Sequence, residues 1–334
     1  MTQGIKDSQT ASKELRTLYA PIQADLDEVE RVLQRELTSQ YPFVDGLVKH
    51  GFRFGGKRLR PALVILSGKA CGGLRPEHPL LGAAVEMIHT ATLIHDDVLD
   101  EATLRRHLDT VNARWDNEAS VLLGDYLFTR AISLASSLES TFACRAIGEA
   151  GRTMCEGELR QIEARGNYAL SEEEYLDIIS GKTAGLCACC CRLGAHYAGA
   201  DADRGEAYAR FGQNLGIAFQ IADDLLDVLG DEATTGKSIG TDLLKQKPTL
   251  PVIRLLSQVD SNERAELLAI LSSPSEENRH ALKLRLKRSD AISYAREKAT
   301  WFARHAAEQL PPLATTLADE SLRQLAEFVV TRRQ

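Results

Sequence analysis

Two acidic clusters of identical spacing stand out in the sequence. Both have the form D-D-x-x-D and both follow an apolar stretch. The first lies in HDDVLDEATLRR and contains Asp96, Asp97 and Asp100; the second lies in FQIADDLLDVLGD and contains Asp223, Asp224 and Asp227. On a helix the first and last acids of each cluster share a face one turn apart. They would repel each other unless a cation lay between them. Oxygen-only ligands favour Mg²⁺, which also accepts phosphate oxygens.

Basic residues beside glycines and acids indicate what such a metal would hold. They are Lys57 and Arg60 in FGGKRLRP, Arg105 and Arg106 after the first cluster, Lys182 with Thr183 in SGKTAG, Lys237 in TTGKSIGTD, and Lys247 in KQKPTLP. Exposed N–H groups at a helix start, next to Lys57 and Arg60, are typical of an anion site. We therefore expect two diphosphate sites, one held by arginine and lysine and one held through Mg²⁺.

Helical periodicity and turn signals run through the whole chain and predict an all-α protein. We expect helices over 11–39, 61–73, 79–101, 117–138, 142–165, 171–199, 203–230, 249–256, 261–272, 275–307 and 319–332. Ser171 with Glu174 is typical of a capping box. Because no Gly/Ser-rich linker divides the chain, we expect a single domain over 1–334 with about ten to thirteen helices.

Composition excludes some function classes. The 334 residues are 44% hydrophobic and 26% charged, which suits a large core, and the net charge of −7 argues against non-specific nucleic-acid binding. No stretch resembles a secretory signal, a membrane span or a lipidation motif, so we expect a cytoplasmic protein without stable membrane insertion.

Four of the seven cysteines lie in GLCACCCRLG: Cys187, Cys189, Cys190 and Cys191. On a helix Cys187, Cys190 and Cys191 share a face, which could form a soft-metal site. The favoured interpretation is a tightly packed helix, where free cysteine behaves as a small apolar residue, because zinc ligands usually lie on turns that wrap the ion.

Six motifs in order resemble those of the trans-isoprenyl diphosphate synthases, the polyprenyl synthetase family. They are GGKRLRP, IHTATLIHDDVLDEATLRR, LLGDYLFTRA, GKTAGL, FQIADDLLDVLGD and GKSIGTDLLKQKPTLP. The resemblance covers about 20–256, with 257–334 as further C-terminal helices. It implies an isoprenoid-synthase helical bundle around a central apolar cavity, a homodimer, and condensation of isopentenyl diphosphate with an allylic diphosphate. It also implies Mg²⁺ as cofactor, three ions per site.

The resemblance also implies roles for individual residues. Metal would be held by Asp96, Asp100, Asp223, Asp224 and Asp227, with Asp97 completing the first catalytic motif. The allylic diphosphate would be contacted by Arg105, Lys182, Thr183, Gln220, Lys237 and Lys247. Isopentenyl diphosphate would be held by Lys57, Arg60, His89 and Arg106. His107 and Asp116 stand where the family usually has glycine, which puts the shape of that loop in question.

This family chemistry explains the acids at the ends of apolar helices. The metal neutralises the diphosphate leaving group, and the allylic cation forms in a water-free pocket where isopentenyl diphosphate is positioned for attack. No side chain need act as base, since released pyrophosphate is a candidate. The hydrocarbon tail then grows into the protein.

Small residues below the first cluster predict a long product. Thr92 lies one helical turn below Asp96, Ile88 lies further down the same side, and Ala91 is next to Thr92. By family precedent, aromatic side chains at Ala91 and Thr92 would stop chain growth early. We expect products of geranylgeranyl length or longer, and octaprenyl-like lengths are compatible with this pattern. Met87 and Phe128 are the candidates for the larger side chain that finally stops the growing tail.

Several other functions are compatible with parts of this pattern. A class I terpene cyclase would share the first motif and the helices, but would not need the site at Lys57, Arg60 and His89. Squalene or phytoene synthase lacks GGKRLRP, and regulatory subunits of heteromeric synthases usually lose one aspartate motif. A short-chain farnesyl or geranylgeranyl synthase, a catalytic subunit of a heteromer and a plain helical scaffold are further alternatives.

Overall fold

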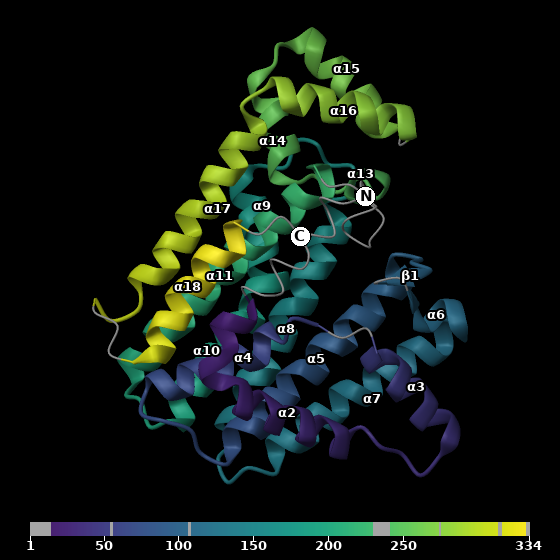
Figure 1. Cartoon of the computed structure of the whole chain (residues 1–334). Helices are drawn as coiled ribbons and strands as arrows, with labels where there is room; N and C mark the ends of the chain where they lie inside the picture. Colours follow the sequence, from purple (N-terminus) through teal and green to yellow (C-terminus); the bar gives the residue numbers. More distant parts are fainter. Residues whose placement is uncertain are drawn as a thin grey trace.

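Helices make up nearly all of the chain that the computed structural model describes, namely residues 15–53, 56–105, 108–229, 241–273, 275–312 and 316–331 (Figure 1). The N-terminal half contains η1 (Ala20–Ile22), α2 (Gln23–Glu36), α3 (Pro42–Arg53), α4 (Leu59–Ala70), α5 (Glu77–Leu99), α6 (Val111–Arg114), α7 (Asn117–Ser136) and α8 (Phe142–Glu163). It is followed by α9 (Glu172–Ile179), η2 (Ser180–Ala184), α10 (Gly185–Tyr197), α11 (Ala202–Leu229), α13 (Thr241–Leu244), α14 (Leu250–Gln258), α15 (Ser261–Ser272), α16 (Glu276–Arg288), α17 (Ala291–Glu308) and α18 (Leu317–Thr331). The predicted all-α class is confirmed.

Two long helices carry the acidic clusters at their C-terminal ends. Helix α5 packs against α4, α7 and α2, and α11 packs against α10 and α17 (Figure 1). Both are apolar through their middle, and residues such as Met87 and Phe211 are fully buried. The core therefore fixes the two helices on which the acids lie.

The helix predicted over 171–199 is wrong in one respect. It begins at the predicted capping box of Ser171 and Glu174, but it changes at Ser180–Ala184 into a turn of π-helix before continuing as α10. A π-turn inserts an extra residue into the helical ladder and is often found at functional sites.

Other boundaries also differ from the prediction. The stretch 275–307 is two helices, because it breaks at Ser289 and Asp290 between α16 and α17. Helix α3 was not predicted, since Gly46 and Gly51 weaken its helical signal. Two short antiparallel strands, β1 (Leu104–Arg105) and β2 (Leu108–Asp109), follow α5. Asp116, in place of the family's usual glycine, caps α7 by accepting the N–H of Ala119 at 2.7 Å.

The α15–α16 pair lies apart from the main bundle, at the top of Figure 1. Its apolar side chains form a separate small cluster with α14, including Leu255, Leu267 and Leu286. This pair lies next to the C-terminal end of α11, so it forms one wall above the second acidic cluster.

Candidate active site

The first acidic cluster lies on the last turn of α5. The helix ends when Glu101 adopts a left-handed conformation (φ 50°), and the N–H groups of Glu101 and Ala102 bond to the carbonyls of Val98 and Asp97 at 3.1 and 2.9 Å. This is the Schellman pattern of a helix end. The C-terminal end of a helix carries partial negative charge, so these carboxylates occupy the end that disfavours them. Cations must compensate.

Asp97 and Asp96 of this cluster have different surroundings. Asp97 is 2% exposed and is held by Arg105, whose Nε and Nη2 donate to it at 2.7–3.0 Å. Arg105 lies in β1, where it pairs with Leu108 of β2. Arg105, predicted to contact the allylic diphosphate, is thus paired with Asp97 in this structure. Burial raises the pKa of Asp96, and nearby Glu158 and Asp100 add to the effect while Lys182 opposes it.

The second cluster contains a buried hydrogen-bonded chain. Thr183 donates its hydroxyl to Gln220 at 2.8 Å, and Gln220 donates to Asp224 at 2.8 Å. The hydroxyl of Tyr175 donates to the other carboxylate oxygen of Asp224 at 2.6 Å. Burial raises the pKa of Asp224, with the charges of Asp223 and Asp227 adding to it. The structure thus brings together Thr183, Gln220 and Asp224, as predicted, and adds Tyr175.

Lys182 reaches the site because of the π-turn and a glycine. A Cβ at Gly157 of α8 would lie 2.4 Å from the backbone nitrogen of Lys182, so only glycine allows η2 to approach α8 this closely. The Lys182 ammonium contacts Glu158 and donates to Gln161 at 2.7 Å. Burial would lower the pKa of Lys182, but Asp96 and Glu158 raise it. Lys182 is therefore a charged group facing the first cluster.

Helix α13 and the turn after it connect the two clusters. The N–H of Asp242 bonds to Asp227 at 3.2 Å. The Lys247 ammonium lies 3.8 Å from Asp242 and 4.0 Å from Asp100. Lys247 thus lies between Asp100 at the end of α5 and Asp242 of α13. Because Asp242 is bonded to Asp227, α13 joins the two clusters. Sequence reasoning missed Asp242, although it lies in the motif that contains Lys237.

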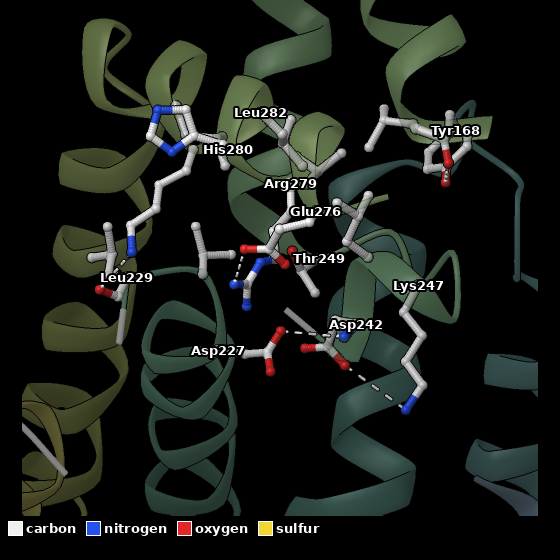
Figure 2. A pocket seen from close by; sticks show the side chains of 16 residues that line it. Tyr168, Asp227, Leu229, Asp242, Lys247, Thr249, Glu276, Arg279, His280 and Leu282 are labelled. Carbon is white, nitrogen blue, oxygen red and sulfur yellow. Dashed lines mark hydrogen bonds and ion pairs between the residues drawn. The ribbon is translucent and has the colours of Figure 1, made fainter. Parts of the chain in front are cut away.

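A cavity of about 440 Å³ lies above the second cluster. Figure 2 shows Asp227, Asp242 and Lys247 on one side of it, and Arg279 and His280 of α16 on the other. Burial raises the pKa of Asp242, and Asp227 and Asp224 raise it further. The lining is mixed: Glu276 and Lys283 add further charges to it, while leucine and valine side chains such as Leu243 and Val252 supply the apolar part.

The carboxylates fit a hard cation by their chemistry. Their donor atoms are all oxygen, and burial together with neighbouring acids raises the pKa of Asp96 and Asp224. Within the described ranges, however, no three His, Cys, Asp or Glu side chains converge closely enough to hold a metal. Lysine side chains lie among the acids instead.

The residues predicted for isopentenyl diphosphate lie near the start of α4. Lys57 is exposed, with its ammonium 5.9 Å from the ring centre of Phe328 of α18. Arg60 is in the first turn, and its Nε is buried without a hydrogen-bond partner. Arg58 instead pairs with Glu30 and Glu86 and begins α4 with a left-handed backbone. An unsatisfied guanidinium nitrogen is compatible with an anion site.

The residues predicted to set chain length lie where they were expected on α5. Ile88 and Ala91 are buried, and Thr92 is half-buried with its hydroxyl bonded to the carbonyl of His89 at 2.8 Å. The Phe128 ring packs against α8, because a Cβ at Gly151 would lie 3.0 Å from it. His89 is half-buried on the same helix. Arg106, His107 and Lys237 lie outside the described residues.

The cysteine run is part of the core. Cys187, Cys189, Cys190 and Cys191 are all buried in α10, and burial raises the pKa of Cys189 to about 12. A Cβ at Gly212 of α11 would lie 2.4 Å from the carbonyl oxygen of Cys187, so the two helices pack closely. The burial of all four thiols and the close helix contact agree with the packing interpretation.

Comparison with known proteins is consistent with this geometry. The family model described as Polyprenyl synthetase matches residues 42–286. The chain belongs to the polyprenyl synthetase family. It is a prenyltransferase of the trans-isoprenyl diphosphate synthase type. The terpene cyclase, squalene synthase and scaffold alternatives are therefore wrong.

Relatives of this family differ in the product that their names give. The chain is 34% identical over 318 residues to an all-trans-nonaprenyl-diphosphate synthase (geranyl-diphosphate specific) of Rhodobacter capsulatus, covering 95% of this chain and 98% of the relative. It is 35% identical over 300 residues to a geranylgeranyl diphosphate synthase of Saccharolobus solfataricus, covering 85% and 89%. The two identities, 34% and 35%, are nearly the same, so they do not distinguish the two product lengths.

A solved structure has nearly the same fold. It is a polyprenyl synthase from Caulobacter crescentus, described as complexed with calcium and isoprenyl diphosphate. Its TM-score is 0.92 at 35% identity, with 96% of this chain and 98% of that chain covered. The described helices of the present chain include none that is both long and apolar enough to cross a membrane.

Proposed function

We propose that this polyprenyl synthetase condenses isopentenyl diphosphate with an allylic diphosphate and makes a trans-polyprenyl diphosphate of medium to long chain, from geranylgeranyl upward. The observation that carries the product length is the small, partly buried pair Ala91 and Thr92 one turn below Asp96. No large side chain at these two positions blocks a growing tail. A farnesyl-sized product is the alternative.

The first acidic cluster would bind the allylic diphosphate through metal. Mg²⁺, three ions per site, would supply positive charge that stabilises the departing diphosphate. Asp96, Asp100, Asp223, Asp224 and Asp227 would hold it. The calcium in the structure of the Caulobacter crescentus relative supports a divalent ion at the site. Asp242, bonded to Asp227, is a further candidate ligand.

The cationic side chains would act on the diphosphate directly. Lys182 would turn its ammonium from Glu158 towards the diphosphate, with Thr183 and Gln220 lining the same side. Lys247 already lies between the two clusters, so little movement is needed. Arg105 would act from its pair with Asp97, and Lys237 would close the loop over the substrate.

The second substrate would bind near the start of α4. Lys57, Arg60, His89 and Arg106 would hold the diphosphate of isopentenyl diphosphate, and the buried unsatisfied nitrogen of Arg60 supports an anion there. The apolar interior of α5 would exclude water from the allylic cation. The proton lost after carbon–carbon bond formation would pass to the released pyrophosphate, since the chemistry requires no side-chain base.

A homodimer is part of this proposal. Val121 and Leu122 of α7 and Leu159 of α8 are exposed apolar side chains on neighbouring helices. Sedimentation of the purified protein would test its oligomeric state. A monomer that retains full activity would contradict the proposed homodimer. We also propose that the protein works in the cytoplasm, without inserting in a membrane.

The deciding experiment incubates the purified chain alone with labelled isopentenyl diphosphate, an allylic primer and Mg²⁺. Dephosphorylated products are then separated by chromatography. We expect a ladder ending at geranylgeranyl length or beyond. A product that stops at farnesyl length would contradict the proposed length, and activity only after a second protein is added would indicate a heteromeric synthase.

A further inference from the structure

Asp100 is surrounded by three cations. The Lys245 ammonium lies 2.6 Å from its Oδ2, Lys247 lies 4.0 Å from the same oxygen, and Arg165 Nη2 lies 3.7 Å from Oδ1. Asp100 caps the C-terminal end of α5, where the helix dipole adds to its negative charge. Lys245, rather than Lys247, makes the close contact. It has no role in the expected family pattern set out above.

Whether two lysines separated by one residue can point at one carboxylate depends on the backbone between them. In a strand they would lie on the same face about 7 Å apart, and on a helix about 200° apart around the axis. Here Gln246, between them, has a left-handed backbone with φ 53°. This bend directs Lys245 and Lys247 towards Asp100.

Backbone hydrogen bonds hold this bend, which we call the lysine turn (residues 242–247). The Gln246 N–H bonds to the carbonyl of Leu243 at 2.9 Å, and that of Lys247 to Asp242 at 2.8 Å. The Gly166 N–H, just after α8, bonds to the carbonyl of Gln246 at 2.8 Å. The turn is thus fixed at both ends, and the position of Lys245 is determined by the backbone.

We propose that Lys245 is a resident cation on Asp100 that a divalent ion has to displace, so that Lys245 sets the ion concentration at which the first acidic cluster fills. An ammonium 2.6 Å from Oδ2 and a divalent ion on the same oxygen would repel each other strongly at such short range. Lys247, shared with Asp242, can remain in place. The inference rests on the proposed metal ligation by Asp100.

The test measures metal binding without turnover. Mn²⁺ is titrated into the substrate-free protein and free ion is followed by electron paramagnetic resonance. We expect Lys245→Gln to bind Mn²⁺ about fivefold more tightly than wild type, the upper range for loss of a partly exposed ion pair. Lys245→Arg, which keeps the positive charge, should bind like wild type or more weakly.

Two control variants separate displacement from a general change in charge. Lys247→Gln also removes one positive charge near Asp100, but it removes no close contact with that carboxylate. It should therefore tighten Mn²⁺ binding less than Lys245→Gln does. Lys69→Gln removes a lysine that lies 2.6 Å from Asp25, with similar side-chain exposure, and should leave Mn²⁺ binding unchanged. Circular dichroism melting confirms that each variant folds.

The outcomes are distinct. Equal Mn²⁺ affinity of wild type and Lys245→Gln, or equal tightening by Lys247→Gln, overturns the inference while metal binding stands. If wild type binds no Mn²⁺, the proposed metal function itself fails. In an Asp100→Asn background, Lys245→Gln should have no effect on the remaining binding; a persistent fivefold effect would also overturn the role of Asp100.

Discussion

At the scale of single residues, Asp224 shows how a carboxylate in this site is oriented. Tyr175 and Gln220 each donate to one of its two oxygens, and all three side chains are buried or half-buried. Tyr175 is 4% exposed and does not face solvent. We therefore expect Tyr175 to act as a positioning residue, through its hydrogen bond to Asp224.

The effect of Tyr175 can be measured as a change in metal requirement. We expect Tyr175→Phe to raise the Mg²⁺ concentration for half-maximal activity about tenfold, as loss of an outer hydrogen bond to a metal ligand commonly does. Tyr208→Phe is the matched control, because its hydroxyl donates to buried Asp319 at 2.7 Å elsewhere in the fold. It should lower the melting temperature without changing the Mg²⁺ requirement. If both variants change only stability, Tyr175 has no positioning role.

Removal of the metal tests both acidic clusters together. Excess EDTA should abolish turnover, and Asp96→Ala or Asp223→Ala should each lower kcat about 10²–10³-fold or more, because each removes charge that stabilises the leaving group. Asp27→Ala, an exposed acid on α2, is the control and should keep normal activity. Near-normal turnover by either cluster variant in EDTA would contradict the mechanism.

At the scale of elements, the π-turn η2 decides where Lys182 lies. Each residue of a regular helix is rotated by about 100° around the axis from the one before. Without the extra residue of the π-turn, the side chains of Lys182 and Thr183 would therefore point in other directions. The extra residue of the π-turn, together with the close approach at Gly157, brings Lys182 to Glu158 and Thr183 to Gln220. The turn thus aligns two predicted substrate-binding residues.

A single methyl group should disturb this element. Gly157→Ala puts a Cβ 2.4 Å from the backbone nitrogen of Lys182 in η2. Backbone atoms cannot rotate away from the new methyl group as a flexible side chain could. We expect a loss of about 1–3 kcal/mol of stability from overpacking and at least a tenfold fall in kcat/KM, measured by thermal unfolding and steady-state kinetics.

The same helix offers a matched control. Gly148→Ala, also on α8, has nothing within 4 Å of the new Cβ among the described residues. It should be neutral or stabilise the protein by up to about 1 kcal/mol through helix propensity. Loss of activity in both variants would show that α8 tolerates no substitution, and the specific role of Gly157 would be rejected.

At the scale of the whole molecule, the bundle turns two distant helix ends into one site. Lys247 contacts both Asp100 of α5 and Asp242 of α13, although these acids are far apart in sequence. Below them the core of α5 runs through Ile88 and Ala91. The growing tail would follow this direction, so product length is a property of the packed bundle.

Product length can be shortened by filling that path. Ala91→Phe combined with Thr92→Phe should shift the products towards farnesyl length, because two aromatic rings would then lie one turn below Asp96. Products of both proteins are compared by chromatography after dephosphorylation. Ser133→Phe, at an exposed position on α7, serves as the control and should leave the length unchanged. A farnesyl-sized wild-type product, unaffected by the double substitution, would show that the path does not pass these residues.

The sequence by itself determined the helical class, the family and most of the candidate site. Periodicity marked α5 and α11, and the two D-D-x-x-D clusters were visible because their spacing is a local property of a helix. The residues Lys182, Thr183 and Gln220 were recognisable from their motifs, and their contacts in the structure agree with a shared site.

Only the tertiary structure decided which groups actually meet. Tyr175 and Asp224 are joined across two helices, and Lys245 reaches Asp100 through the left-handed Gln246; neither contact has a signal in local spacing. The π-turn at Ser180–Ala184 was equally hidden, since the close approach to Gly157 that accompanies it involves another helix. Local patterns fix which face a residue occupies, whereas the pairing of charges depends on how separate helices pack.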